Sequence, residues 1–487
     1  MKLTLSPTEI SAHVHKTVFC FVPVGLMLLL GGRAWAWDAA TTHAGMTGRA
    51  LGASQFHKVL AHQLGRALGP FEPLKLHPNA MDADALRALN SRLGMLDSAG
   101  GYRPSGDGVL TALGWVKAGA VLAKTPPELG RHHFFEPGKR TGLDDGPGLS
   151  GTVHAARLTL GSGATVRNAA TGDAFDLQGM PAIEWLSSRQ NDLGLQAFFD
   201  NWQLAVTAKE PSQRETALVR ALLAMGGVLS VLEDVGQPAF VRNDFRGEFS
   251  DVGSELETFV ADRYGSFALP QPAPSVDRPD IESYFVGSDG QGLAQVTQQH
   301  FFSAGTLPSD FRCVAGDTTV GAAVLVNQSL KFAEPRLDAL NLQPSARPRY
   351  VVRDGVKIAA YQRVADRIHF FLDKAVYADM AQAWLPRVMG FTAGLADHLL
   401  RGKLQATVAA DEATLTLSGV GSNLDGDMAA HIFGEDESGV RQEVGVGIIR
   451  GSSATVALPK GTRKISAFAR GRDSAGPFVA TGELTLP

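Results

Sequence analysis

The segment SQRETALVRALLAMGGVLSVLEDVGQP, Ser212 to Pro238, is the clearest helix signal in the chain. Ser212 and Glu215 have the spacing of an N-terminal capping box, and Gly236 and Pro238 mark the end of the helix. Between these ends the segment is strongly apolar, yet Asp234 stands near its end. A carboxylate in such surroundings is costly unless something pairs with it, although an aspartate in a last turn can also reach water.

The pattern changes along the chain on either side of this helix. Amphipathic runs such as ALRALNSRLGML predict further helices between Thr47 and Lys209. The run FALPQPAPSVDRPD, 267–280, is too rich in proline to be helical. RYVVRDGVKIAAY predicts a hairpin that turns at Asp354-Gly355, and a long helix follows from about Lys374 to Arg401.

Beyond Leu404 the pattern becomes an alternation of apolar and polar residues, as in ATLTLSGVG, ATVALP and GELTLP. We therefore expect a mainly α protein, with a helical domain followed by a small C-terminal β-sandwich domain. The helical domain is assigned to residues 37–403, with a mixed insert at about 267–373, and the β-sandwich to residues 404–487.

The N-terminus has the pattern of a secretory signal. Lys2 and Lys16 precede the apolar run VFCFVPVGLMLLLGG, which is too short for a membrane-spanning helix and is followed by the small-x-small pattern Ala34-x-Ala36. Residues 1–36 are thus predicted to be removed, leaving Trp37 at the start of a secreted or periplasmic protein with no transmembrane segment. An N-terminal membrane anchor is the alternative.

Composition agrees with an ordinary exported globular protein. The 487 residues carry 45 basic and 49 acidic side chains, so no overall basic charge indicates nucleic-acid binding, although a local basic groove stays open. Cys20 would leave with the signal, and Cys313 would then be the only thiol, so no intramolecular disulfide is expected. Stability must come from core packing, with metal as an additional source.

Three stretches together resemble one family. They are LEDVGQPAFVRND around Asp234, RHHFFEPGK around His133, and Trp37 followed by His43. This combination resembles the zinc-dependent phospholipases C and their relatives, the single-strand-specific zinc nucleases. The resemblance spans Trp37 to Val260 and continues to about Arg401. It implies a helical phosphodiesterase scaffold in which the free N-terminal tryptophan binds zinc.

Carried over residue by residue, the resemblance implies a partial ligand set. Trp37, His43 and Asp234 match the groups that hold one zinc, and Asp234 also bridges to a second zinc. His133 matches a ligand of that second zinc, and Glu257 matches the carboxylate of a third. Asp234 is the residue expected to serve catalysis.

Four of the nine expected ligands are replaced. Ser230, Phe240 and Gly253 stand where the family has histidines, and Ala123 or Lys124 stands where it has an aspartate. Phosphodiester cleavage in this family depends on clustered zinc ions that activate a water and hold the phosphate. The resemblance therefore implies about one zinc per chain, at most two, and not a full set of three.

Neighbouring residues suggest two kinds of compensation. Glu233, His132, Glu136 and Asp244 lie close to the vacated positions and are able to bind metal, although each has the simpler interpretation of a solvated or capping residue. Alternatively, the ammonium of Lys124 occupies the space of a lost cation and pairs with Asp234 and Glu257.

Three functions remain open at this stage. The chain is a phosphodiester hydrolase of the phospholipase C type with reduced or altered activity, or a pseudoenzyme or binding protein on the same scaffold with one structural zinc. The third is a surface component attached through its β-domain. The substrate class, phospholipid head group or nucleic acid, and contact with a membrane surface are not readable from the sequence.

Overall fold

The computed structural model describes most of the chain from residue 39 to residue 485. The described residues are 39–96, 104–143, 166–167, 174–175, 179–244, 255–267, 274–308, 311–312, 347–365, 367–409, 412–421, 423–459 and 464–485. The predicted signal at 1–36, Trp37, Gly253 and Cys313 lie outside these residues.

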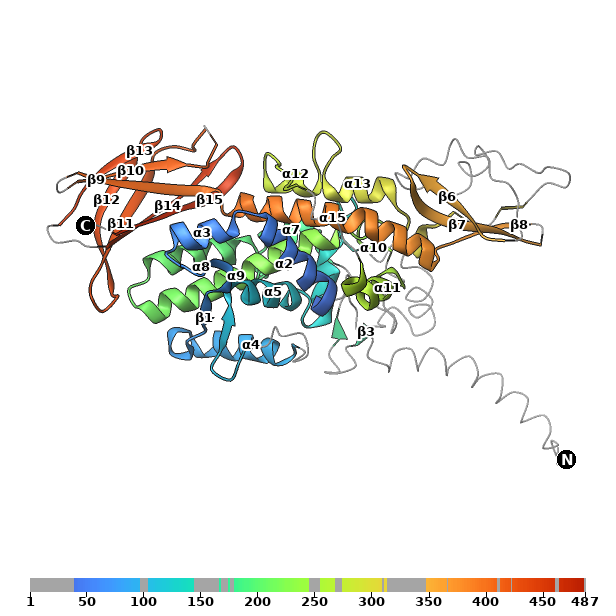
Figure 1. Ribbon diagram of the computed structural model, residues 1–487, viewed down its shortest axis with the longest axis horizontal. Helices are drawn as coiled ribbons and strands as arrows, with labels where there is room; N and C mark the ends of the chain where they lie inside the picture. The colour runs from blue at the N-terminus through green and yellow to red at the C-terminus, as the bar shows by residue number, and fades with distance from the viewer. Residues whose placement is uncertain are drawn as a thin grey trace, which may run out of the picture.

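A helical body forms the centre of the molecule, and α9 (Pro211–Asp234) runs through it (Figure 1). Around and beside it lie α2 (Ala44–Ala53), α3 (Phe56–Gln63), α4 (Ala83–Gly94), α5 (Ala112–Leu122), α7 (Ala182–Ser187), α8 (Leu195–Thr207), α10 (Pro238–Val241), α11 (Glu255–Arg263), α12 (Ile281–Phe285), α13 (Leu293–His300) and α15 (Lys374–Leu399). Shorter elements include η1 (Ala39–His43), η5 (Pro127–His133) and the pair β1 (Pro73–Lys75) and β2 (Val109–Thr111).

The helix α9 is buried on nearly all sides, chiefly by α5 and α8 and then by α15. Two glycines allow the closest of these contacts, because a Cβ at Gly119 would collide with the backbone of Leu223, and one at Gly226 with the backbone of Val116. Among the described helices, α9 alone has the length and apolar composition to cross a membrane. Because 89% of its apolar window is buried against protein, it is a core helix here.

The helix is confirmed, but its predicted capping box is wrong. The helix begins at Pro211, and Glu210 caps it together with Gln213 rather than Ser212 with Glu215. Proline suits the first helical position because its missing N–H would be unpaired there anyway. Glu215 instead accepts a hydrogen bond from the backbone of Lys75 and contacts the ring of His77.

Two further predictions of local structure are confirmed. The hairpin turns at Asp354-Gly355 between β6 (Arg349–Arg353) and β7 (Val356–Val364), and both turn residues have positive φ. The long helix α15 then runs from this hairpin sheet, which includes β8 (Arg367–Phe371) and β5 (Phe311–Arg312), to the C-terminal domain (Figure 1).

The C-terminal domain is built of strands, as expected, but they form one hydrogen-bonded sheet. Its order is β12-β11-β14-β15-β9-β10-β13, and the two edge strands meet where Gly445 and Gly447 face Val456. The sheet therefore curls almost into a barrel around its own apolar core. The strands are β9 (Gly402–Ala409), β10 (Glu412–Ser418), β11 (Met428–Glu435), β12 (Arg441–Ile449), β13 (Ser453–Ala457), β14 (Lys464–Asp473) and β15 (Gly476–Thr485).

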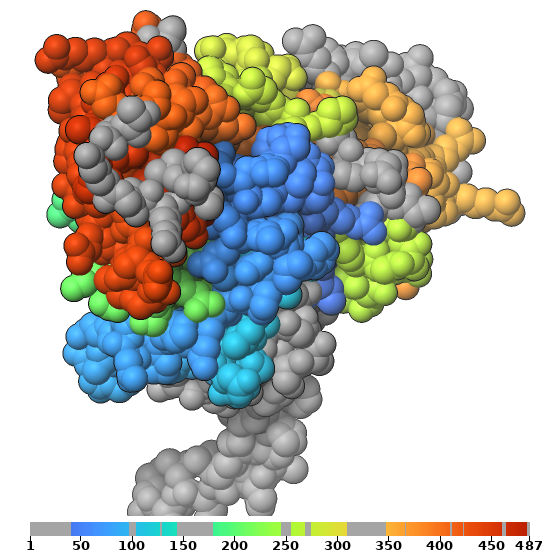
Figure 2. Space-filling model, turned by 60° about the vertical axis from the view of Figure 1, so that its left-hand side comes forward, coloured from blue at the N-terminus to red at the C-terminus, as the bar shows by residue number. Residues whose placement is uncertain are grey.

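This domain packs against the N-terminal helices (Figure 2). Strand β15 contacts α3, where the hydroxyl of Thr481 donates to the side-chain oxygen of Gln63 at 3.1 Å. Strand β14 contacts α8, where Arg470 pairs with Asp200 at 2.7 Å. The C-terminal domain is therefore joined to the helical body by side-chain contacts at two separate helices.

Candidate functional site: a buried charge cluster at the end of helix α9

The carboxylates of Glu233 and Asp234 end α9 in the interior of the helical body. Both residues are 0% exposed. The C-terminus of a helix carries a partial negative charge, so two carboxylates there are unfavourable unless cations face them. The sequence around α9 therefore requires positive groups from neighbouring elements.

His43 supplies the first of these groups from the junction of η1 and α2. Its Nδ1 lies 2.6 Å from Oε2 of Glu233, and its Nε2 lies 2.8 Å from Oδ1 of Asp234. One turn further along α2, the hydroxyl of Thr47 donates to Oε1 of Glu233 at 2.9 Å. Sequence reasoning missed Thr47, although its i,i+4 spacing from His43 places both on one helix face.

Lys124 supplies the second positive group, just after the end of α5. Its Nζ lies 3.2 Å from Oδ1 of Asp234 and 3.0 Å from Nε2 of His43, and the residue is 1% exposed. The contact with Asp234 therefore agrees with the hypothesis that Lys124 pairs with this carboxylate. Ala123, the other residue considered for this position, is the C-cap of α5.

His133 reaches Asp234 from the end of η5. Its Nδ1 donates to Oδ2 of Asp234 at 2.6 Å, while its Nε2 is buried and has no hydrogen-bond partner within the described part of the chain. The next residue, Phe134, stacks on Phe240 with ring centroids 4.2 Å apart. Phe240 thus fills space with an aromatic ring where the family resemblance implies a histidine.

Burial and the neighbouring charges set the protonation of these groups. Burial favours the neutral form of each, but Lys124 and His43 hold the pKa of Asp234 well below its ordinary value. Burial and Lys124 oppose charge on His43, yet the two carboxylates raise its pKa, whereas burial lowers the pKa of His133. We therefore assign an ionised Asp234, a protonated His43 and a neutral His133. Burial raises the pKa of Glu233, which shares a short hydrogen bond with His43.

Two further positions of the implied ligand set lie in the described part of the chain, one with a predicted ligand and one where serine replaces a histidine. Glu257 lies on α11 with 3% of its surface exposed, and α11 packs against η1, the element that ends at His43. Ser230 lies one turn before Asp234, and its buried Oγ has no hydrogen-bond partner among the residues that the structure describes. The roles of Trp37, His43, His133, Asp234 and Glu257 as metal ligands stay predictions.

Of the neighbours considered as substitute ligands, only Glu233 joins the cluster through the contacts above. His132 instead stacks on Trp185, with ring centroids 4.2 Å apart. Glu136 pairs with Lys139 at 2.9 Å, and Asp244 accepts a hydrogen bond from the backbone of Gly305 at 2.6 Å. All three are buried rather than solvated, and none of these contacts joins them to Asp234.

The arrangement of the described residues does not fit a zinc ion. Both ring nitrogens of His43 and both oxygens of Asp234 are engaged in hydrogen bonds, and the ammonium of Lys124 lies beside both residues. In the described ranges no group of three or more His, Cys, Asp or Glu side chains has the geometry to hold a metal. Among the described residues of the cluster, the free Nε2 of His133 is a feature that favours metal binding.

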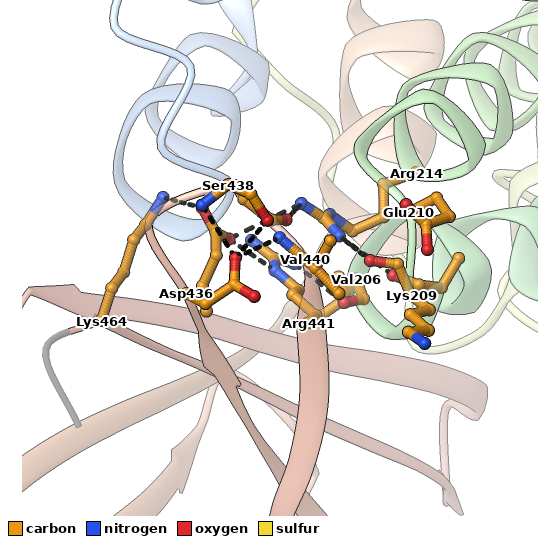
Figure 3. Close-up of polar contacts among 12 residues, drawn as sticks. Val206, Lys209, Glu210, Arg214, Asp436, Ser438, Val440, Arg441 and Lys464 are labelled. Carbon is orange, nitrogen blue, oxygen red and sulfur yellow. Dashed lines mark hydrogen bonds and ion pairs between the residues drawn. The ribbon is translucent and has the colours of Figure 1, made fainter. Parts of the chain in front are cut away.

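Open cavities occur elsewhere, at the boundary between the helical body and the C-terminal domain. One, of about 210 Å³, is lined by Arg66, Arg214, Glu435, Arg441, Lys464 and Glu483 among others. Figure 3 shows that Arg214 and Arg441 lie next to each other, between α9 and the turn that contains Asp436 and Ser438. Another cavity, of about 580 Å³, lies between α7, α8, α12 and the turn joining β14 and β15.

Comparison with known proteins gives no close relative. No family model and no curated protein matches the chain. Among solved structures it is similar to the alpha toxin from Clostridium absonum, with 11% identity over 93% of this chain and 99% of that chain, at a TM-score of 0.26. It is also similar to the alpha-toxin of Clostridium perfringens avian strain SWCP, with 10% identity over 93% and 100% of the two chains, at a TM-score of 0.25. At these values no residue correspondence is drawn from either structure.

Proposed function

We propose that this chain is an exported protein on the scaffold of a zinc-dependent phospholipase C, in which phosphodiester hydrolysis is reduced or lost. One observation carries the proposal: His43 and His133, which the sequence motifs single out, both contact Asp234. His43, His133 and Asp234 are separated from one another by at least 90 positions in the sequence, and each comes from a different element.

Two features support the loss of activity. Phosphodiester hydrolysis by metal ions needs an open coordination position and access for the phosphate. Here His43, His133 and Asp234 are each 0% exposed, and Lys124 pairs with the carboxylate that would bridge two zinc ions. An ammonium neutralises charge but does not act as a Lewis acid on water.

The second candidate is a binding protein on the same scaffold. The closed cluster favours it, because a fully buried site has a structural role without needing substrate access. In this case the C-terminal β-domain, whose boundary with the helical body carries the open cavities, provides attachment to a partner or a membrane surface. If this binding protein holds the one zinc that the sequence predicts, the free Nε2 of His133 is the atom that we expect to bind it.

The experiment measures hydrolysis and metal content on the same exported preparation. N-terminal sequencing establishes whether the mature chain begins Trp-Asp-Ala-Ala-Thr, and elemental analysis counts zinc. A chromogenic phosphodiester, phospholipid vesicles and single-stranded nucleic acid are the substrates, each with and without added zinc. Asp234→Asn removes the charge at the centre of the cluster, and His62→Ala, on the exposed face of α3, is the matched control.

The proposal expects turnover at background level that neither zinc nor Asp234→Asn changes. Substantial hydrolysis that Asp234→Asn abolishes and His62→Ala preserves would show an active enzyme and overturn it. A comparison of the hydrolysis rates of phospholipid vesicles and of single-stranded nucleic acid would then identify the substrate class.

A further inference from the structure

The position of Lys124 raises the question of what stabilises the cluster. A fully buried ammonium is unfavourable unless charged and hydrogen-bonding groups surround it. Lys124 is 1% exposed, and its Nζ contacts both Asp234 and His43. These contacts place the ammonium among the same groups that the sequence motifs assign to a metal.

The distances are those of hydrogen bonds, not of coordination. Zinc holds nitrogen and oxygen ligands at about 2.0–2.1 Å in a tetrahedron, which separates two donor atoms by about 3.3 Å. Nε2 of His43 and Oδ1 of Asp234 are 2.8 Å apart, the length of a direct N–H···O bond. The ammonium donates to Oδ1 of Asp234 at 3.2 Å, again in the range of hydrogen bonds, and lies 3.0 Å from Nε2 of His43, which donates to the same oxygen.

The side chains of the cluster also satisfy one another without a metal. His43 and Lys124 face the carboxylates of Asp234 and Glu233, and Thr47 gives Glu233 a further hydrogen bond. A divalent cation added to this set would have to displace the ammonium, because the two positive charges would compete for Asp234.

We infer that Lys124 is a built-in cation that replaces zinc, so that the helical body folds and stays folded without metal. This inference deepens the proposed function, because it gives a physical reason why the scaffold persists after hydrolysis is lost. It stands on the geometry of Lys124, His43 and Asp234, and it is tested through stability rather than through turnover.

The first test compares thermal stability with and without metal in the full exported chain. With Lys124 as the cation, EDTA and added zinc should each change the melting temperature of the wild-type chain by less than ~1 °C, since neither binds the folded state preferentially. A wild-type chain that carries zinc, and whose melting temperature falls when EDTA removes it, would overturn the inference.

The second test removes the cation. Lys124→Met keeps most of the length of the side chain but leaves Asp234 without its ammonium, and should lower the melting temperature by about 3–5 °C. Lys117→Met, on the preceding helix α5, is the matched control and should have a much smaller effect, because Lys117 lies outside the cluster.

A double variant tests the pairing directly. Adding Asp234→Asn to Lys124→Met removes both charges, so the double variant should be more stable than the sum of the two single changes predicts. Strict additivity, or a Lys124→Met chain as stable as the wild type, would show that the pairing does not hold the cluster together.

The third test reverses the replacement. Lys124→Asp removes the positive charge and adds a shorter carboxylate that leaves space next to Asp234 for a cation. Added zinc should raise the melting temperature of this variant but not that of the wild-type chain, with a colorimetric chelator measuring the bound ion. A variant that folds but gains no zinc response would contradict the claim that Lys124 occupies the cation position. If Lys124→Asp does not fold, the double variant of Lys124→Met and Asp234→Asn still tests whether the pairing of these two residues stabilises the cluster.

The outcomes also separate this inference from the proposed function. Zinc bound by the wild-type chain overturns the inference whether or not substrate is cleaved. Hydrolysis by a wild-type chain that contains no zinc overturns the proposed function and leaves the pairing of Lys124 with Asp234 intact.

Discussion

The cluster around Asp234 and the boundary network around Arg441 contain similar charged side chains in different surroundings. In the cluster, Asp234 is 0% and Lys124 1% exposed, and side chains make the contacts that join Asp234 to Lys124, His43 and His133. At the boundary, Arg441 is 10% exposed and bonds to Glu435 and to the backbone oxygen of Val206.

The difference lies in what remains when one partner is lost. Arg214, beside Arg441, donates to the carbonyls of Lys209 and Gly439, and the cavity next to it admits water. A charge left behind there is partly rehydrated. A charge left behind in the Asp234 cluster stays buried, so deletion is costlier although each intact pair contributes only modestly.

The largest expected effect is therefore at the centre of the cluster. Asp234→Ala leaves Lys124 and His43 facing each other without their shared carboxylate, and should lower the free energy of unfolding by about 3–5 kcal/mol. Urea denaturation followed by tryptophan fluorescence measures this loss. Asp192→Ala is the control, because Asp192 is 71% exposed and its pairing with Arg92 should contribute only ~0.5 kcal/mol.

An Asp234→Ala chain as stable as the Asp192→Ala chain would remove the distinction between the two regions. It would mean that the buried charges are solvated or neutralised without Asp234.

A smaller effect is expected at the boundary. Arg441→Ala removes the ion pair with Glu435 and the hydrogen bond to Val206, and should cost about 2 kcal/mol. The loss should loosen the packing of β12 on α8 before it unfolds α9. Hydrogen exchange should therefore show faster exchange in the C-terminal sheet, with α9 still protected. Arg450→Ala is the control, because Arg450 is 79% exposed. It should change neither the free energy of unfolding nor the exchange rates of the C-terminal sheet.

Uniform loss of protection in α9 and in the sheet would contradict this order of events. It would show that the helical body and the C-terminal domain unfold as one cooperative unit.

The boundary should also respond to acid through His398, near the end of α15. Its Nε2 lies 3.1 Å from the carbonyl of Ala475, and its ring packs edge-on against Tyr284. Burial, then Arg401, lowers the pKa of His398 from 6.5 to about 4, although Asp473 and Asp280 oppose the shift.

The sign of the pH dependence follows from this lowered pKa. The unfolded chain takes up a proton at His398 below about pH 6.5, whereas the folded chain does so only near pH 4. Stability should therefore fall as the pH drops through this window, by about 3 kcal/mol at this buried position, and the change should level off below pH 4. Urea titrations at a series of pH values measure the free energy of unfolding. This free energy should depend less on pH in His398→Gln than in the wild type.

The sequence predicted the elements better than their contacts. Local periodicity was enough for α9, α15 and the turn at Asp354-Gly355, because each depends on nearby residues. The capping box failed because Pro211 and Glu210 start the helix earlier, and the closure of the C-terminal sheet depends on packing between β12 and β13 that alternation does not encode.

The cluster was predictable only in part for the same reason. His43, His133 and Asp234 were identified by their resemblance to family motifs. The contact of Lys124 with Asp234 depends on the fold, because the two residues are far apart in the sequence. Thr47 needed knowledge that its helix faces Glu233, and the bond from Arg214 to Gly439 joins residues 225 positions apart. Long-range pairs of this kind have no local signal.

The smallest expected effect is at Ser230, where the motif resemblance implies a metal-binding histidine. Its Oγ is buried and has no hydrogen-bond partner in the part of the chain that the structure describes, so Ser230→Ala removes no interaction there and avoids the cost of a buried unpaired hydroxyl. The free energy of unfolding should change by no more than ~0.5 kcal/mol, or rise slightly. Thr47→Ala is the matched control, because it deletes a hydroxyl that does donate to Glu233 and should cost about 1 kcal/mol. Equal losses at the two positions would reveal a partner for Ser230 that the contacts above do not contain, and a loss that disappears after EDTA treatment would identify that partner as a metal.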